Sequence, residues 1–175
     1  LTYSTVAERS IIQLISVFDM DGLPAIALEV APPSITSQTL DKYTLIDAMH
    51  QLAQTTHMVH ESGVSFTDFD PLMKIPRIRW DATAKRIKII DWNVTRETED
   101  FKRRDLVFLG RIYFQLLTGY PAWAKNEPLV DGLPNRKNEY ALEITGAGSD
   151  KWRDTESAVR DVIERLMIED ANDAI

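Results

Sequence analysis

The chain has 175 residues with a formal net charge of -7 and a pI near 5.0. Its 44% hydrophobic and 27% charged residues suit one globular domain, and the acidic balance disfavours a nucleic-acid-binding surface. The absence of cysteine excludes disulfides and thiolate metal sites and suits a cytoplasmic or otherwise intracellular location, and no apolar run reaches the roughly 20 residues of a membrane span.

The first elements predicted along the chain are two strands and a helix. Apolar runs at 11–17 and 25–30 are separated by turn-forming Asp, Gly and Pro residues, which predicts a β-hairpin. A loop rich in Pro and Ser follows over 31–39. Apolar residues then recur at near-helical spacing, which predicts a helix from about Leu40 to Glu61 that stops at Gly63.

The second half of the chain predicts two more strands and two more helices. Short strands at 77–80 and 86–90 flank a turn. A broad apolar stripe between Leu106 and Leu117 predicts a largely buried helix, which ends where glycine and then proline follow Thr118. Apolar residues at 159–167 mark a last helix, and the region 126–152 is expected to be mostly loop.

Two aspartates stand where they can reach into a cleft. Asp68 follows the short apolar segment Val64-Ser-Phe66, and Asp91 ends the β-branched run Ile87-Lys-Ile-Ile90. This arrangement resembles the protein kinase-like superfamily, in which the catalytic loop H-R-D-x-K-x-x-N is followed by a strand and D-F-G. Here the two motifs read Phe66-Thr-Asp68 and Asp91-Trp-Asn93.

The order of the other elements strengthens the resemblance. His60 to Asp68 resembles the family run L-H-x-x-x-h-x-H-R-D, and Asp105 to Gly119 resembles the helix D-x-W-S-L-G…L-L-T-G. The resemblance implies an α+β, protein kinase-like fold that fills 1–175 as one domain. On this alignment, 1–31 is a remnant of the N-lobe strands with the hinge, and 32–175 is a mainly helical C-lobe.

The resemblance also predicts a nucleotide site. Leu28 takes the gatekeeper position, and the main-chain groups of Glu29 and Ala31 in the hinge would face an adenine. Asp68 takes the position of the general base, and Asp91 takes that of the Mg²⁺ ligand. ATP and Mg²⁺ are therefore the implied cofactors, with binding that is weak or absent because of the substitutions described below.

Three further residues have implied structural roles. The carboxylate of Asp105 is expected to accept main-chain N–H bonds from the loop between Phe66 and Asp68. Phe66 and Trp92 keep apolar bulk where the family stacks a regulatory spine.

The departures from the family concern the chemistry. The lysine two residues after the base is Asp70, whose carboxylate would repel a γ-phosphate. The asparagine position is Met73 counted from Asp68 or about Arg77 counted back from Asp91, and neither supplies a neutral oxygen to Mg²⁺. Asp105 follows Asp91 by only 14 residues, too few for a peptide-binding platform, and no A-P-E motif is present. The Gly-rich loop and strand lysine are absent from these residues.

Simpler interpretations stand beside several of these assignments. Asp68 also fits a turn residue that bonds main-chain amides. His57 and His60 have the i, i+3 spacing of a metal pair, but no third ligand is evident and packing or capping is the commoner role. The cluster Lys102-Arg-Arg104 is most simply a solvated charge run, and Trp80, Trp123 and Trp152 are most simply packing residues.

The leading hypothesis is a pseudokinase that regulates or scaffolds a protein partner. The alternatives are an active atypical ATP-dependent kinase whose N-lobe lies outside this sequence, and a structural docking domain without nucleotide affinity. The sequence does not indicate the partner or the oligomeric state.

Overall fold

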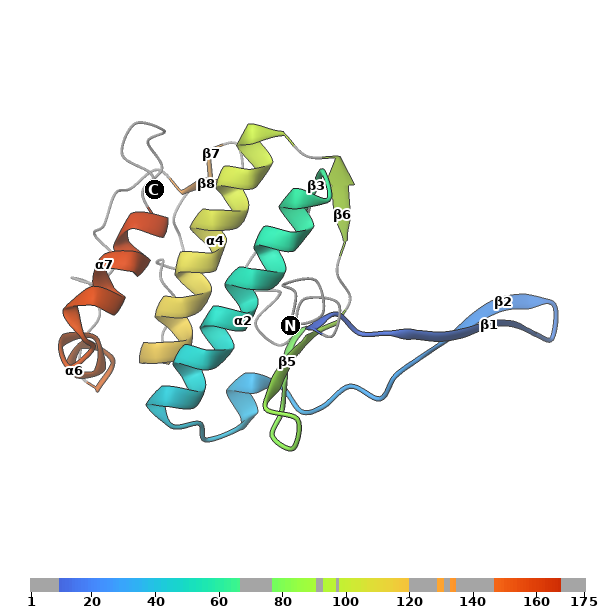
Figure 1. Ribbon diagram of the computed structural model, residues 1–175, viewed down its shortest axis with the longest axis horizontal. Helices are drawn as coiled ribbons and strands as arrows, with labels where there is room; N and C mark the ends of the chain where they lie inside the picture. The colour runs from blue at the N-terminus through green and yellow to red at the C-terminus, as the bar shows by residue number, and fades with distance from the viewer. Residues whose placement is uncertain are drawn as a thin grey trace.

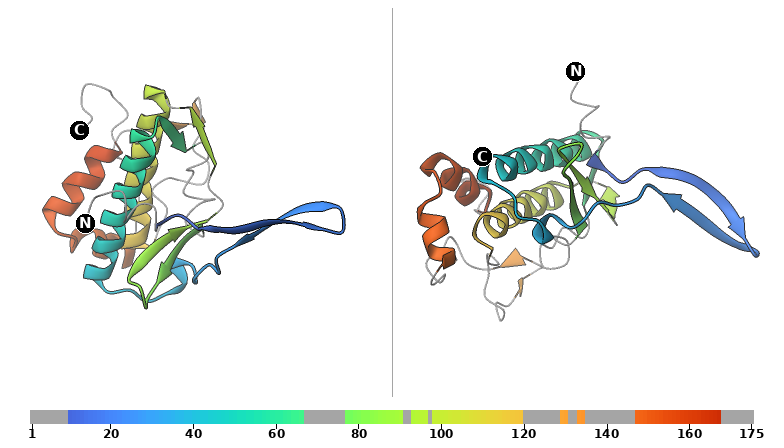
Figure 2. Two further views of the ribbon diagram at one scale, coloured as in Figure 1. Left: turned by 45° about the vertical axis from the view of Figure 1, so that its right-hand side comes forward. Right: turned by 90° about the horizontal axis from the view of Figure 1, so that it is seen from below.

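The computed structural model describes residues 10–66, 77–90, 93–96, 98–119, 129–130, 133–134 and 147–167. Two long helices form its centre: α2 (Lys42–Glu61) and α4 (Glu99–Thr118) lie side by side and run in opposite directions (Figure 1). The shorter helices α6 (Ala147–Arg153) and α7 (Ser157–Leu166) pack on α4 (Figure 2). The described residues between 98 and 167 are therefore mainly helical, as the sequence predicts.

Each long helix has clear end signals. The Asp41 carboxylate caps α2 by accepting main-chain N–H bonds from Tyr43 at 2.9 Å and Thr44 at 3.0 Å. Thr98 caps α4, with its hydroxyl oxygen accepting from the Phe101 N–H at 3.3 Å. The end of α4 is fixed by Gly119, whose φ of 80° is a left-handed conformation that glycine adopts without strain.

Short antiparallel strand pairs surround the helices. They are β3 (Val64–Phe66) with β6 (Val94–Arg96), β4 (Ile78–Asp81) with β5 (Arg86–Ile89), and β7 (Leu129–Val130) with β8 (Leu133–Pro134). The short helix η1 (Ile35–Ser37) precedes α2. The pair β4–β5 confirms the strands predicted at 77–80 and 86–90, and its inward residues Trp80 and Ile87 join the core.

The predicted hairpin is present and projects away from the helical body (Figures 1 and 2). Strands β1 (Leu14–Met20) and β2 (Leu23–Leu28) pair antiparallel around a two-residue turn at Asp21 and Gly22, both with positive φ. Its apolar side chains are exposed on both faces; they include Leu14, Ile15, Val17, Phe18, Met20, Leu23, Ile26 and Leu28.

The core lies between α2, α4, α7 and the sheet β4–β5. Phe114, Leu52, Ile112 and Ile163 are almost completely inaccessible to solvent, and the buried Trp152 ring packs 4.9 Å from the Phe114 ring. Burial of Trp80 and Trp152 confirms their predicted packing role, whereas Trp123 lies outside the described residues. One prediction fails in part, because residues 147–152 of the expected loop belong to helix α6.

Candidate functional site

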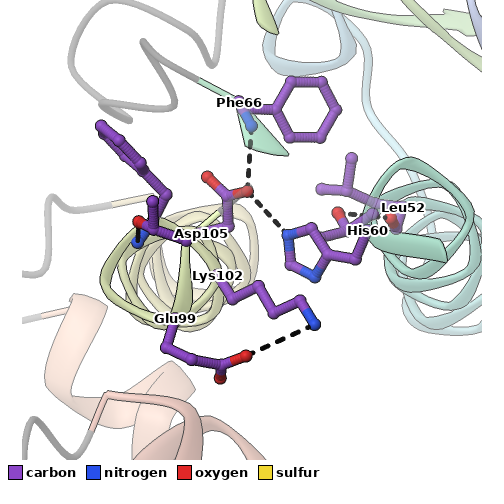
Figure 3. A network of polar contacts seen from close by, with 9 residues as sticks. Leu52, His60, Phe66, Glu99, Lys102 and Asp105 are labelled. Atoms are coloured by element: carbon purple, nitrogen blue, oxygen red, sulfur yellow. Dashed lines mark hydrogen bonds and ion pairs between the residues drawn. The ribbon is translucent and has the colours of Figure 1, made fainter. Parts of the chain in front are cut away.

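The site is built around a buried carboxylate on the second turn of α4. Asp105 is fully buried, and its Oδ2 accepts a hydrogen bond from the main-chain N–H of Phe66 at 3.0 Å (Figure 3). The same oxygen lies 2.7 Å from Nε2 of His60. The carboxylate thus joins the end of α2, the end of strand β3 and helix α4.

Two opposing effects act on the pKa of the Asp105 carboxyl group. Burial raises the pKa of Asp105, while hydrogen bonds from His60 and Phe66 oppose that shift by favouring the charged form. Its second oxygen, Oδ1, is buried and has no hydrogen-bond partner among the described residues, as is also true of Ser65 Oγ. The polar interior at this point is therefore only partly satisfied by the residues described.

The structure brings together two of the predicted site residues. The sequence analysis expected a main-chain hydrogen bond from the Phe66 loop to Asp105, and the structure contains one. Phe66 is also buried in the core. Asp68, Asp91 and Trp92 lie outside the described residues, so the catalytic, metal and spine roles assigned to them stay predictions.

The predicted hinge follows directly after β2. The main-chain N–H of Glu29 donates to the Gln13 carbonyl oxygen at 3.0 Å, which leaves the Glu29 carbonyl and the Ala31 N–H without a main-chain partner among the described residues. Leu28, at the gatekeeper position, is 45% exposed. The segment predicted as a hinge therefore has one main-chain acceptor and one main-chain donor, the two kinds of group that an adenine ring recognises.

An ion pair that the sequence did not suggest fixes the Glu29 side chain. Glu29 Oε1 lies 2.5 Å from Nζ of Lys88 on β5, and both side chains are largely shielded from solvent. A shielded pair is less weakened by salt than an exposed one. It holds the base of the hairpin to the sheet β4–β5.

His60 is the other functional-site residue that sequence reasoning missed. It was expected to pack or cap, and its contact with Asp105 spans 45 residues of sequence. His57, its neighbour at i, i+3, is exposed. Within the part of the chain that the structure describes, no group of three His, Asp or Glu side chains is placed to hold a metal ion. Nor does any described helix have a stretch long and apolar enough to cross a bilayer.

Comparison with solved structures identifies the architecture. The chain superposes on the autoinhibited serine kinase domain of the giant muscle protein titin with a TM-score of 0.70 and 14% sequence identity, covering 99% of this chain. The chain has a protein kinase-like fold. It spans 62% of the length of that titin kinase chain. Comparisons with protein-family models and with curated protein sequences found no match.

Proposed function

We propose that this kinase-like domain is a regulatory or scaffolding protein-interaction module that transfers phosphate poorly or not at all. The observation that carries the proposal is Asp70, which stands where the family has a lysine that steadies the transferred phosphate. Phosphoryl transfer depends chiefly on positioning and charge neutralisation, and a second carboxylate works against the latter.

The support lies in a contrast between scaffold and chemistry. Asp105 contacts both Phe66 and His60 in the buried interior, so this part of the kinase-like fold is stabilised by hydrogen bonds. The sequence lacks the lysine and asparagine partners of the catalytic loop. A domain that keeps the buried hydrogen bonds and lacks the catalytic lysine and asparagine can still bind another protein through its surface.

The hairpin β1–β2 supports interaction with protein. Eight large apolar side chains on its two faces are between 45% and 67% exposed. Contiguous apolar patches of this kind are uncommon on monomers unless another polypeptide covers them, and the strands carry no lysine or arginine that would discourage pairing. The proposed partner therefore contacts the chain at this hairpin.

Nucleotide binding is a subordinate part of the proposal. Glu29 and Ala31 would bind the adenine through their main-chain groups beside Leu28, and Asp91 would hold Mg²⁺, which neutralises phosphate charge when it is bound. Asp70 and Asp91 place two negative charges near a triphosphate, so ATP should bind weakly and only with Mg²⁺.

Two measurements on the 175-residue chain test the proposal. Incubation with Mg²⁺ and ATP should give no phosphate transfer to a generic peptide above the level of an Asp68→Asn variant. Calorimetric titration with ATP should show weak or no binding in Mg²⁺ and none in EDTA. Transfer that is abolished by Asp68→Asn would contradict the proposal, and sub-micromolar ATP affinity in EDTA would show a differently built site.

The second candidate is an active atypical kinase, and it is favoured by the retention of both acids. Asp68 and Asp91 occur in the family order, and the chain spans only part of the titin kinase chain. In this alternative Asp68 is the base and the N-lobe is supplied from outside these residues. A third candidate, a docking domain without nucleotide affinity, predicts no ATP binding under either condition, so detectable binding in Mg²⁺ would exclude it.

A further inference from the structure

The projecting hairpin β1–β2 has two outer edges, and they differ. Among the described residues its sheet contains only these two strands, so each strand has one edge that pairs with no other strand. Along an antiparallel pair, residues whose N–H and C=O groups bond inward alternate with residues whose groups point outward. Met20 and Leu23 flank the two-residue turn and therefore bond inward. The next pair, Asp19 with Pro24, points its main-chain groups outward.

The proline makes β1 the better edge for pairing with another strand. Pro24 has no main-chain N–H, so the outer edge of β2 lacks a donor at this position. The next outward pair is Val17 with Ile26, so the outer edge of β1 offers the N–H and C=O groups of both Val17 and Asp19. A register shift near the base of the hairpin limits the regular part of this edge to 16–20. A short strand of about that length can pair here.

Both faces of β1 are apolar. Val17 and Phe18 are neighbours in the strand, so their side chains point to opposite faces, and both are exposed. Met20 lies on the same face as Phe18 and is also exposed. Consecutive side chains of an added strand would therefore each meet an apolar neighbour. Such a strand gains most from burial when its own consecutive residues are apolar.

The charges of the hairpin are negative and lie at its tip. Asp19 and Asp21 are exposed, and 14–28 contains no lysine or arginine. At the base, Glu29 is neutralised by Lys88. Strand β1 runs from base to tip, so a strand added antiparallel to it runs from tip to base. The N-terminal end of the added strand would then lie beside the two aspartates, where a lysine or arginine is attracted.

A second copy of this chain does not meet that requirement. Its own hairpin carries the same two aspartates and no basic residue, and chains with a net charge of -7 repel one another. The charge pattern therefore favours a different polypeptide.

We propose that the outer edge of β1 binds an extended, apolar segment of a partner protein whose N-terminal end carries lysine or arginine. The segment adds to the hairpin as a third, antiparallel strand. This inference rests on the proposed function, which assigns the hairpin to a protein partner, and it names the chemistry of that partner.

Hydrogen exchange at single amides tests the added strand directly. The probe is an acetylated and amidated peptide of two lysines followed by valine, phenylalanine, valine and threonine, added to the isotopically labelled 175-residue chain. At about 90% occupancy, exchange of the Val17 and Asp19 N–H groups should slow about tenfold, because these amides exchange only from the free chain. The Ile26 N–H, on the outer edge of β2, should exchange at an unchanged rate.

Two peptide controls test direction and charge. The reversed sequence places its lysines at the base of an antiparallel strand, and a peptide with glutamates in place of the lysines faces the aspartates with like charge. Each should bind at least about fivefold more weakly at low salt than the first peptide.

Charge variants of the hairpin complete the test. The double change Asp19→Asn with Asp21→Asn should weaken binding of the lysine peptide about twofold to thirtyfold. Asparagine at 19 keeps an acceptor for the Gly22 N–H, which bonds Asp19 Oδ1 at 2.8 Å, and asparagine tolerates the positive φ at 21. The matched change Asp154→Asn with Asp161→Asn alters the net charge equally on the far side of the helical body and should leave binding unchanged (Figure 1).

Several outcomes overturn the inference. Unchanged exchange at Val17 and Asp19 with the lysine peptide would exclude strand addition at this edge. Equal binding of the lysine and glutamate peptides would remove the charge requirement. Slowing that grows with protein concentration in the absence of peptide would assign the edge to a second copy. If the hairpin variants fail to fold, the peptide series on the unaltered protein still decides the question.

Failure of this inference is distinguishable from failure of the proposed function. Phosphate transfer that Asp68→Asn abolishes would contradict the proposed function whatever the peptides do. Unchanged exchange at the β1 edge would exclude this partner chemistry without altering the result of the transfer assay.

Discussion

The Asp105 carboxylate offers the most direct test of the site. Replacing it with alanine removes two hydrogen bonds to a charged acceptor, one from the buried main-chain N–H of Phe66 and one from His60. Hydrogen bonds to charged groups contribute about 1.5–3 kcal/mol each, and relief of the buried charge offsets part of their loss. We expect Asp105→Ala to lower the free energy of unfolding by about 2–4 kcal/mol, equivalent to about 4–16 °C in melting temperature.

The pH dependence of stability separates the charge of Asp105 from its shape. Because burial raises the pKa of Asp105 above its ordinary value, the folded state binds the carboxyl proton more tightly than the unfolded state does. The stability that comes from protonation of Asp105 is therefore fully present below the pKa that Asp105 has in the unfolded state. It is lost as the pH rises through the pKa that Asp105 has in the folded state. Asp105→Asn keeps the shape without this titration, so the stability of the natural protein relative to the variant should decline with rising pH.

Urea unfolding followed by tryptophan fluorescence, repeated from about pH 4 to about pH 7, measures both effects. Asp161→Ala is the matched control, since Asp161 forms an exposed ion pair with Arg165 at 3.1 Å and its loss should change stability by less than about 1 kcal/mol. An unchanged free energy of unfolding in Asp105→Ala would refute the network. A relative stability that rises with pH would show that the bond to His60 outweighs burial.

Three further predictions concern the scaffold. Gly110→Ala should destabilise the fold by about 1–3 kcal/mol in urea unfolding, because an added Cβ would lie 2.9 Å from the Leu166 Cβ. Tyr113→Phe should lower the free energy of unfolding by about 1 kcal/mol, because the buried hydroxyl donates to a main-chain oxygen of α2 at 2.5 Å. An unchanged free energy of unfolding would contradict that hydrogen bond. Asp41→Ala should lower the melting temperature, an effect that shrinks as pH falls because hydrogen bonds from Thr44 lower the pKa of Asp41.

The long elements were predictable because their patterns repeat. The apolar spacing along α2 continues over 20 residues, and Asp41 and Gly63 mark its two ends. Two apolar runs on either side of Asp21 and Gly22 predicted the hairpin. What the pattern did not predict is that both faces of the hairpin would be exposed, because burial depends on what packs against the strands and not on their own composition.

The short elements escaped prediction for the opposite reason. Helix α6 has seven residues, and Trp152 is its one large apolar side chain, so no periodicity can develop. Strands β3 and β6 have three residues each and are defined by pairing with one another across the chain. Such segments are selected by tertiary contacts and carry little local signal.

The site was predictable only where a resemblance supplied the long-range pairing. The hydrogen bond between Asp105 and Phe66 followed from the family pattern, since nothing local links positions 39 residues apart. The contact of His60 with Asp105 and the ion pair of Glu29 with Lys88 join side chains from different elements. Sequence spacing alone cannot show which polar residues meet once the elements pack.

The residues that build the scaffold and those that would transfer phosphate form separate sets. Asp105, His60 and Phe66 are held by burial and by hydrogen bonds to one another across α2, β3 and α4. In the proposed alignment, a substitution at Asp70 or Met73 would change the charge or ligands offered to a triphosphate, but it removes none of these hydrogen bonds. Stability and phosphoryl transfer therefore place different demands on the sequence, and the chain can satisfy the first without the second. That separation is the physical basis for proposing a kinase-like fold that serves as an interaction module.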